Sequence, residues 1–149
     1  MSLPKLGMIM SLVVLATWTT SVLAEALPVG KGVTAADRAL AMKLMKMDPQ
    51  DANPEKDLEI AKVDLNGDGH LDYVVTVNNS MFCGSGGCAT GVFVAAGSSY
   101  RQVADMLAFG VDLGDGSTKG VRDLVQRGRA GTARWVWEGR TYRQIPANK

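Results

Sequence analysis

The sequence predicts an α+β protein that is mostly β, in which an antiparallel sheet meander carries one N-terminal helix packed on it. Apolar residues recur at helical spacing between residues 34 and 47, whereas apolar and polar residues alternate after Pro54. Turns that contain glycine separate the alternating segments, which is typical of antiparallel strands. The length of 149 residues suits a single domain.

Residues 1–24 have the pattern of an export signal. Lys5 supplies a positive start, residues 6–16 form an apolar run, and residues 22–24 provide a cleavage site before Glu25. The apolar run is shorter than the span of about 20 residues that crosses a membrane. We therefore expect a cleaved signal, no stable membrane insertion after cleavage, and a periplasmic or secreted protein in an oxidising compartment.

The mature chain is expected to begin with a mobile lead over residues 25–33, followed by a single globular domain over residues 34–149. A helix should begin at Thr34, because Thr34 and Asp37 have the spacing of a capping box. It should stop before Pro49, since the residue that precedes a proline is disfavoured in the helical region. Its apolar face comprises Ala36, Leu40, Leu44 and Met47.

Strands are expected through the rest of the domain. Leu58 and Ile60 alternate with charged neighbours, and the segment 71–77 alternates without interruption. The segment 112–117, which contains a Gly-Asp-Gly sequence, is expected to be a plain turn. Further strands are expected at residues 91–96, 100–107, 121–126, 133–138 and 141–145.

The charge balance argues against a nucleic-acid partner. The chain has 16 Lys and Arg against 15 Asp and Glu, a formal net charge of +1. Its distribution is uneven, because residues 25–99 contain 6 basic and 10 acidic side chains and residues 100–149 contain 9 and 5. The arginines of the second half form a possible patch for anionic polymers, although solubility of exposed strands explains them more simply. They are Arg122, Arg127, Arg129, Arg134, Arg140 and Arg143.

The strongest functional signal is the acidic loop at residues 64–72, with the sequence DLNGDGHLD. Oxygen-bearing side chains occupy its positions 1, 3, 5 and 9, a glycine occupies position 6, and a backbone carbonyl stands at position 7. Ca²⁺ takes six to eight hard oxygen ligands, and alternate positions of a turning loop direct such groups inward. The predicted metal site comprises Asp64, Asn66, Asp68, His70 through its carbonyl, and Asp72.

These residues resemble the calcium loops of EF-hand proteins, of dockerins and of the FG-GAP or VCBS repeats of β-propellers. Val75 stands at position 12, where an EF-hand has a bidentate Glu, and strands are expected on both sides where an EF-hand has helices. The form closed by Asp72 is most similar to the FG-GAP or dockerin type. The resemblance implies a structural calcium site of modest affinity, and the alternative is a solvated acidic turn.

Both cysteines lie in one short glycine-rich segment. In an exported protein, Cys83 and Cys88 at this spacing predict a disulfide. Zinc binding by the two thiolates and His70 would lack a fourth ligand. The enclosed residues form a candidate interaction loop, or else a clip between two strands. These residues are Gly84, Ser85, Gly86 and Gly87.

The sequence favours binding over catalysis, because no complete catalytic motif is present. We expect a calcium-binding, disulfide-stabilised module whose partner is a protein or an envelope component. One alternative is an inhibitor or immunity protein for a cell-wall hydrolase, in which the Cys83–Cys88 loop enters the enzyme's cleft as in small periplasmic lysozyme inhibitors. Another is a serine hydrolase that uses Ser85 and His70, a chemistry that also needs an orienting carboxylate.

Overall fold

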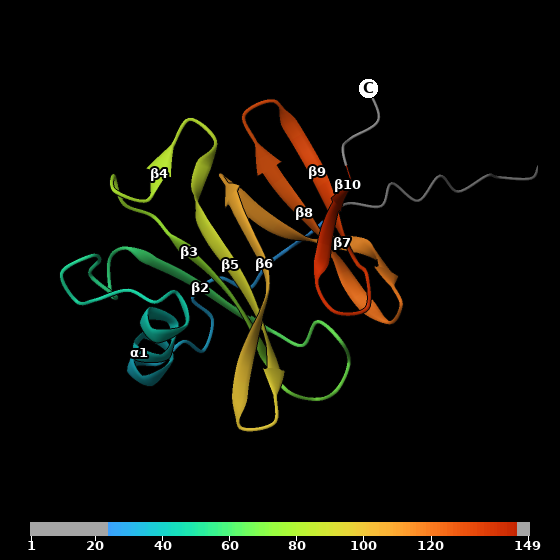
Figure 1. Cartoon of the computed structure of the whole chain (residues 1–149), viewed down its shortest axis with the longest axis horizontal. Coiled ribbons are helices and arrows are strands. Elements are labelled where there is room, and N and C mark those ends of the chain that lie inside the picture. Colours follow the sequence, from blue (N-terminus) through green and yellow to red (C-terminus); the bar gives the residue numbers. More distant parts are fainter. Residues whose placement is uncertain (1–23, 146–149) are drawn as a thin grey trace, which may run out of the picture.

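The computed structural model describes residues 24–145, and in this part of the chain one helix and two antiparallel sheets form three layers (Figure 1). The helix is α1 (Ala35–Leu44). The middle sheet contains β2 (Leu58–Val63), β3 (Asp72–Val77), β4 (Cys83–Gly84), β5 (Gly87–Ala96) and β6 (Ser99–Ala108). The outer sheet contains β1 (Glu25–Ala26), β7 (Gly110–Thr118), β8 (Val121–Gly128), β9 (Gly131–Trp137) and β10 (Tyr142–Ile145).

The predicted class, mostly β with a single helix and antiparallel strands, is confirmed for the described residues, and the strands divide between two sheets. The outer sheet has the order β1-β7-β8-β9-β10, and in the middle sheet β2, β3, β5 and β4 are neighbours while β6 also pairs with β5. The reason lies in β3, which is apolar on both faces. Val74 packs between the sheets, whereas Tyr73 and Val75 pack under the helix. A strand of this kind needs a cover on each side.

Two hydrophobic cores hold the layers together. The larger core lies between the sheets and includes Val92, Val103, Leu113, Val121 and Leu124. The smaller core lies between α1 and the middle sheet and includes Ala41, Met42, Ile60, Val77 and Phe93. The loops that join the strands therefore gather at the two ends of the sandwich (Figure 1).

The predicted capping box of α1 is confirmed. Thr34 Oγ1 accepts a hydrogen bond from the Asp37 backbone N–H at 3.2 Å, and Asp37 Oδ2 accepts one from the Thr34 N–H at 2.7 Å. Asp37 also accepts hydrogen bonds from the Tyr73 hydroxyl and, at 3.0 Å, from Lys62. Burial alone would raise the pKa of Asp37, but these hydrogen bonds outweigh it and hold the pKa far below its ordinary value.

The helix ends at Leu44, earlier than the proline predicts. The Met47 N–H bonds to the Met42 carbonyl at 2.9 Å and the Lys46 N–H bonds to the Lys43 carbonyl at 3.1 Å. This pair of bonds closes the helix in a Schellman motif. Lys46 adopts the left-handed φ of 57° that the motif requires.

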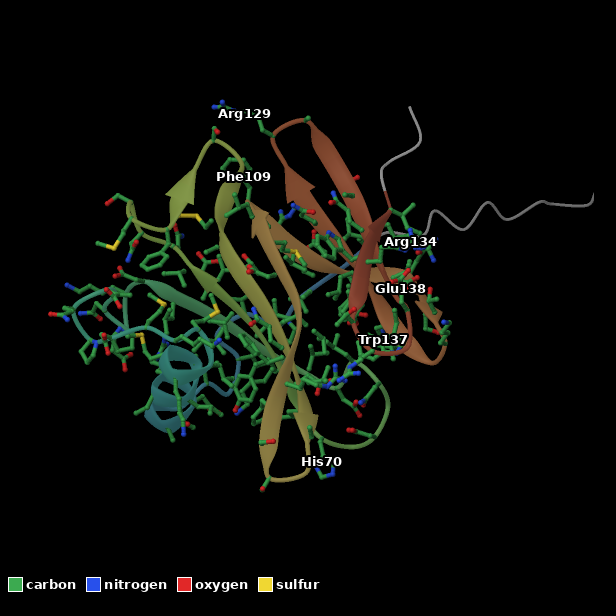
Figure 2. All side chains as sticks on the ribbon, in the orientation of Figure 1. His70, Phe109, Arg129, Arg134, Trp137 and Glu138 are labelled. Carbon is green, nitrogen blue, oxygen red and sulfur yellow. A yellow bond between two sulfur atoms is a disulfide. The ribbon has the colours of Figure 1, made fainter. Side chains whose placement is uncertain are left out.

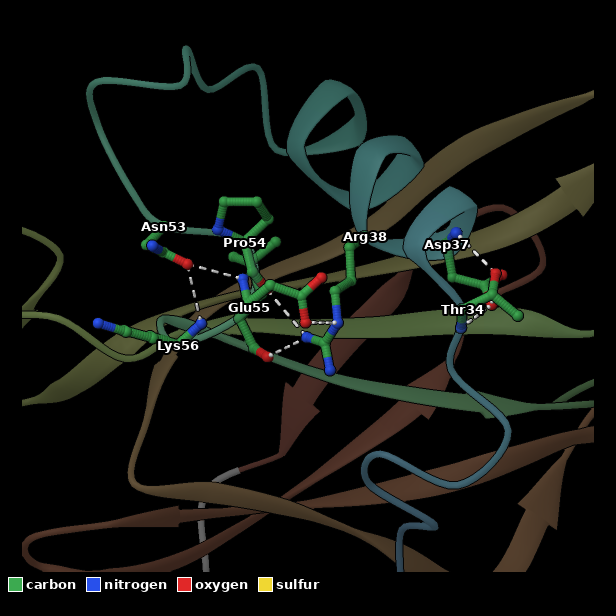
Figure 3. A network of polar contacts seen from close by, with 8 residues as sticks. Thr34, Asp37, Arg38, Asn53, Pro54, Glu55 and Lys56 are labelled. Atoms are coloured by element: carbon green, nitrogen blue, oxygen red, sulfur yellow. Dashed lines mark hydrogen bonds and ion pairs between the residues drawn. The ribbon is translucent and has the colours of Figure 1, made fainter.

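The segment after the helix is bound back onto it (Figure 3). Arg38 Nη1 donates to the Pro54 carbonyl at 2.9 Å, and Arg38 Nε lies 3.0 Å from a carboxylate oxygen of Glu55. Asn53 Oδ1 accepts hydrogen bonds from the backbone N–H groups of Glu55 and Lys56 at 3.0 and 3.2 Å. These contacts fix the chain where it enters β2.

The prediction of a mobile lead over residues 25–33 is wrong in part. β1 pairs with β7, with Glu25 opposite Leu113, and Leu27 is buried in the core between the sheets. Val29 forms an isolated bridge with Ala61 of β2. The segment therefore spans both sheets, with Leu27 as its buried anchor.

The predicted plain turn at residues 112–117 is also wrong. These residues belong to β7, which pairs with β8 on both sides of an irregularity between Leu113 and Ser117. Val111 and Leu113 point into the core and keep the strand in place despite the Gly-Asp-Gly sequence.

The predicted export signal lies outside the described residues except for Ala24, so it stays a prediction. Among residues 24–145, no helix has the length and apolar character needed to cross a membrane.

Candidate functional site

The acidic loop 64–72 joins β2 to β3 at one end of the sandwich. Asp64 Oδ1 accepts hydrogen bonds from the backbone N–H groups of Gly67 at 2.7 Å and Asp68 at 3.3 Å, and Asp64 Oδ2 accepts one from Gly69 at 2.9 Å. The hydrogen bond from Gly69, with those from its neighbours, lowers the pKa of Asp64. Gly67 and Gly69 have φ values of 73° and 84°, so glycine suits both turning positions.

Three further predicted ligands form the exposed tip of the same loop. Asn66 Oδ1 accepts from the Asp68 N–H at 3.1 Å, and Asn66 Nδ2 donates to Asp68 Oδ2 at the same distance. Asp68 Oδ1 accepts from the His70 N–H at 2.8 Å. His70 lies at the tip of this end of the molecule (Figure 2).

Asp72, the last predicted ligand, is fully buried at the start of β3. Its Oδ2 accepts from the Leu65 N–H at 2.9 Å and its Oδ1 accepts from the Ala95 N–H at 2.8 Å. The Leu65 carbonyl in turn accepts from the Arg122 N–H at 2.7 Å. The Asp72 carboxylate and Leu65 thus tie the loop to β5 and β8, which belong to different sheets.

Burial raises the pKa of Asp72, and the negative charges of Asp68 and Asp64 raise it further. The Asp68 and Asp64 carboxylates therefore lie close enough to Asp72 to affect its pKa. Only one of the loop's two leucines anchors it, because Leu65 is 1% exposed whereas Leu71 is 48% exposed.

The carboxylates of the predicted metal site accept hydrogen bonds from the backbone in this structure. Within the described part of the chain, no group of three or more His, Cys, Asp or Glu side chains is arranged to hold a metal ion. Calcium binding by this loop therefore stays a prediction.

The opposite end of the sandwich carries the cysteine hairpin. Cys83 and Cys88 form the predicted disulfide and stand opposite each other in the β4–β5 pair. Gly87 has a φ of 116°, and a Cβ at this position would lie 2.3 Å from the backbone carbon of Ala108. Glycine is therefore required here, because it lets β5 approach the end of β6.

Two exposed apolar side chains lie at the same end of the sandwich as this hairpin. Leu107 at the end of β6 is 53% exposed, and Phe109 at the corner between β6 and β7 is 54% exposed. A Cβ on Gly86 would lie 3.4 Å from Leu107 Cδ1, so Leu107 lies beside the hairpin turn. We call Ser85, Gly86, Leu107 and Phe109 the hairpin surface; Figure 2 shows Phe109 at the end opposite His70.

Sequence reasoning missed Leu107 and Phe109 as surface residues. The sequence did contain a signal for their exposure, because the alternation of apolar and polar residues is lost between residues 106 and 109, where four successive residues are apolar. Met106 and Ala108 are buried, so Leu107 between them points to the opposite face of β6, where both it and Phe109 after the strand are exposed.

Ser85 and His70 are not brought together. They lie beyond opposite ends of β3, a strand of six residues that spans about 20 Å. The serine-hydrolase pairing is therefore wrong for this arrangement. Zinc binding by the cysteines fails as well, because both sulfurs are in the disulfide.

Most of the arginines considered as an anionic-polymer patch are neutralised. Ion pairs join Arg122 to Glu25, Arg127 to Asp112, Arg134 to Asp123 and Arg143 to Glu138. These contacts favour the simpler explanation, in which the arginines stabilise and solubilise the outer sheet.

Comparison with models of protein families, with curated proteins and with solved structures gave no match for this chain.

Proposed function

We propose that the chain is an exported binding module that captures a protein of the cell envelope through the hairpin surface. The observation that carries this proposal is the exposure of Leu107 and Phe109, each more than half accessible, at the end of the sandwich that carries a turn closed by a disulfide. Large apolar side chains at the centre of a contact supply much of the binding free energy in protein interfaces.

The hairpin's constraint supports the same proposal. The disulfide and the close approach of Gly87 to Ala108 hold the turn in one conformation. A turn that is already ordered loses less conformational entropy when it binds. Entry of this narrow turn into the cleft of a cell-wall hydrolase is one form that such binding takes, and it corresponds to the inhibitor or immunity alternative.

The test uses matched substitutions at the two ends. The double variant Leu107→Ser/Phe109→Ser should lose partner capture from an envelope extract while keeping its melting temperature within about 3 °C of wild type. Leu71→Ser is the control, since Leu71 is similarly exposed but lies in the acidic loop. Equal capture by all three proteins, or equal loss in both variants, would contradict the proposal.

We further propose that the acidic loop binds Ca²⁺ and that the ion stabilises this end of the fold. The negative charges of Asp64 and Asp68 raise the pKa of Asp72, which indicates repulsion between these carboxylates and Asp72. A divalent cation would relieve this repulsion, and this supports the proposal. The proposed ligands are those predicted from the sequence, with His70 contributing its carbonyl.

Thermal melts with Ca²⁺ and with chelator test this site. At a Ca²⁺ concentration ten times the dissociation constant, binding adds about 1.4 kcal/mol to the free energy of unfolding. This corresponds to a rise of roughly 5 °C in melting temperature for a chain of this size. Asp68→Ala should abolish the shift, and Asp105→Ala, an exposed carboxylate on β6, should preserve it. Identical melting temperatures of the wild type with and without Ca²⁺ would refute the proposal.

Export is part of the proposed function. Its support is the charged start, apolar run and small residues of the first 24 positions, together with a disulfide, which persists in oxidising compartments. Cleavage before Glu25 would leave β1 complete. The intact mass of protein recovered from the periplasm or the medium should correspond to a chain that starts at Glu25, and retention of residues 1–24 would contradict this.

A further inference from the structure

A cavity of about 680 Å³ lies between the C-terminal part of α1 and the β5–β6 hairpin, apart from both ends already described. Leu40 and Leu44 of the helix and Phe93 of β5 supply its apolar lining. Ser98 and Ser99 add hydroxyl groups where β5 turns into β6. Figure 1 shows α1 beside the middle sheet, on the face that the outer sheet leaves uncovered.

The charges around this cavity have one sign. Lys43 and Lys46 line it, and no acidic side chain does. Neither lysine forms an ion pair with a residue in the described range 24–145. Arg101 also borders the cavity, but its guanidinium donates to the Arg140 carbonyl and lies over the Trp137 ring at 5.9 Å, on the side of the outer sheet.

The backbone of Lys46 adds an independent observation. Lys46 occupies the left-handed position of the Schellman motif, with a φ of 57°, where glycine is the usual residue. A residue with a Cβ is disfavoured in this conformation. Interaction with the helix dipole accounts for a lysine at position 43, inside the last turn, but it does not require one at position 46.

We propose that this cavity binds a small amphipathic anion, with a carboxylate, sulfonate or phosphate group held by Lys43 and Lys46. The apolar body of the ligand packs against Leu40 and Phe93. The volume falls in the range of small-molecule sites, and apolar walls with a few convergent polar groups are typical of them. The inference is independent of the hairpin surface and of the calcium loop, because it uses none of their residues.

The binding test uses 4-phenylbutyrate as the probe, measured by calorimetry and by amide chemical shifts. Its neutral counterpart 4-phenylbutanamide keeps the apolar body, and acetate keeps only the carboxylate. We expect measurable binding of 4-phenylbutyrate, with shifts at residues 43–46 and 98–102, and at least fivefold weaker binding of each comparison compound. No binding of 4-phenylbutyrate, or equal binding of the amide, would overturn the proposal.

Lys46→Gly separates a binding role from a structural one. This substitution should raise the melting temperature by about 3 °C, since it removes the backbone strain, and should weaken 4-phenylbutyrate binding about fivefold. Lys119→Gly is the matched control, because Lys119 also has a left-handed φ, of 52°, but lies in the β7–β8 turn. The control should leave binding unchanged. Equal affinity of wild type and Lys46→Gly would overturn the proposed role of the cation.

Discussion

The two ends of the sandwich are both fixed by a very small number of groups, but by different chemistry. At the acidic loop, the buried Asp72 carboxylate accepts two backbone N–H groups and so connects the loop to β5. At the hairpin, a disulfide and the close packing of Gly87 on Ala108 fix the turn. The first arrangement depends on the charge of a buried carboxylate, so it should respond to a change in pH and to the proposed Ca²⁺. The second responds to reduction of the disulfide and to steric change.

The largest expected effect is at Asp72. Asp72→Ala leaves the Leu65 and Ala95 N–H groups without their acceptor in a buried position, and we expect a loss of about 3 kcal/mol in the free energy of unfolding. Urea denaturation in the presence of chelator measures this without a contribution from Ca²⁺. Asp68→Ala is the control, because Asp68 is exposed. Equal stability of the two variants would show that Asp72 does not hold this end.

The next effect concerns glycine packing at the hairpin. Gly87→Ala places a Cβ against the Ala108 backbone and puts an alanine at a φ that is unfavourable for it. We therefore expect a loss of about 2 kcal/mol or more in the free energy of unfolding. Gly86→Ala in the same turn meets only ordinary contact with Leu107 and should change stability by less than about 0.5 kcal/mol. The same denaturation experiment compares them, and a tolerated Gly87→Ala would argue against the close approach of β5 and β6.

Removal of the disulfide should lower the free energy of unfolding by about 2 kcal/mol. The effect is modest because the disulfide closes only a short loop in the unfolded chain. Cys83→Ala/Cys88→Ala is the variant, and wild type treated with dithiothreitol should reproduce its midpoint of denaturation. The same reductant should leave the midpoint of the double variant unchanged. If oxidised and reduced wild type unfold at the same denaturant concentration, the disulfide does not stabilise this end.

The smallest effect is electrostatic and concerns the pKa values of two carboxylates in the acidic loop. The pKa of Asp64 should lie below the ordinary value, because Gly69 and its neighbours donate hydrogen bonds to the carboxylate. The pKa of Asp72 should lie above it, because burial and the nearby charges of Asp68 and Asp64 disfavour ionisation. An NMR titration of the carboxyl carbons in chelator measures both values, and the reverse order would contradict the structure.

Local features of this protein were predictable because they depend on residues close together in sequence. The Thr34–Asp37 capping box involves a spacing of three residues, and the disulfide involves a spacing of five. The glycine-rich acidic loop was likewise located from its own sequence. The role of Asp72 was not, because its second partner, Ala95, is 23 residues away and belongs to another strand.

Burial of individual apolar residues was predicted less well. Leu65 and Leu71 looked equivalent in sequence, but only Leu65 enters the core. The backbone of Leu65 bonds to Asp72 and to Arg122, which turns its side chain inward, and Leu71 on the approach to β3 has no cover. Alternation indicates which residues share a face of a strand, but not which face another layer will cover.

The sequence by itself determined the mostly β class, the start of the helix, the disulfide and the position of the acidic loop, because short-range spacing and backbone preference fix these features. Only the tertiary structure decided the division into two sheets, the pairing of residues 25–26 with β7, and the exposure of Leu107 and Phe109. It also assembled the cationic cavity from α1 and the β5–β6 hairpin, more than 40 residues apart. The physical reason is that such features arise from which apolar faces cover one another, a choice made by the whole chain.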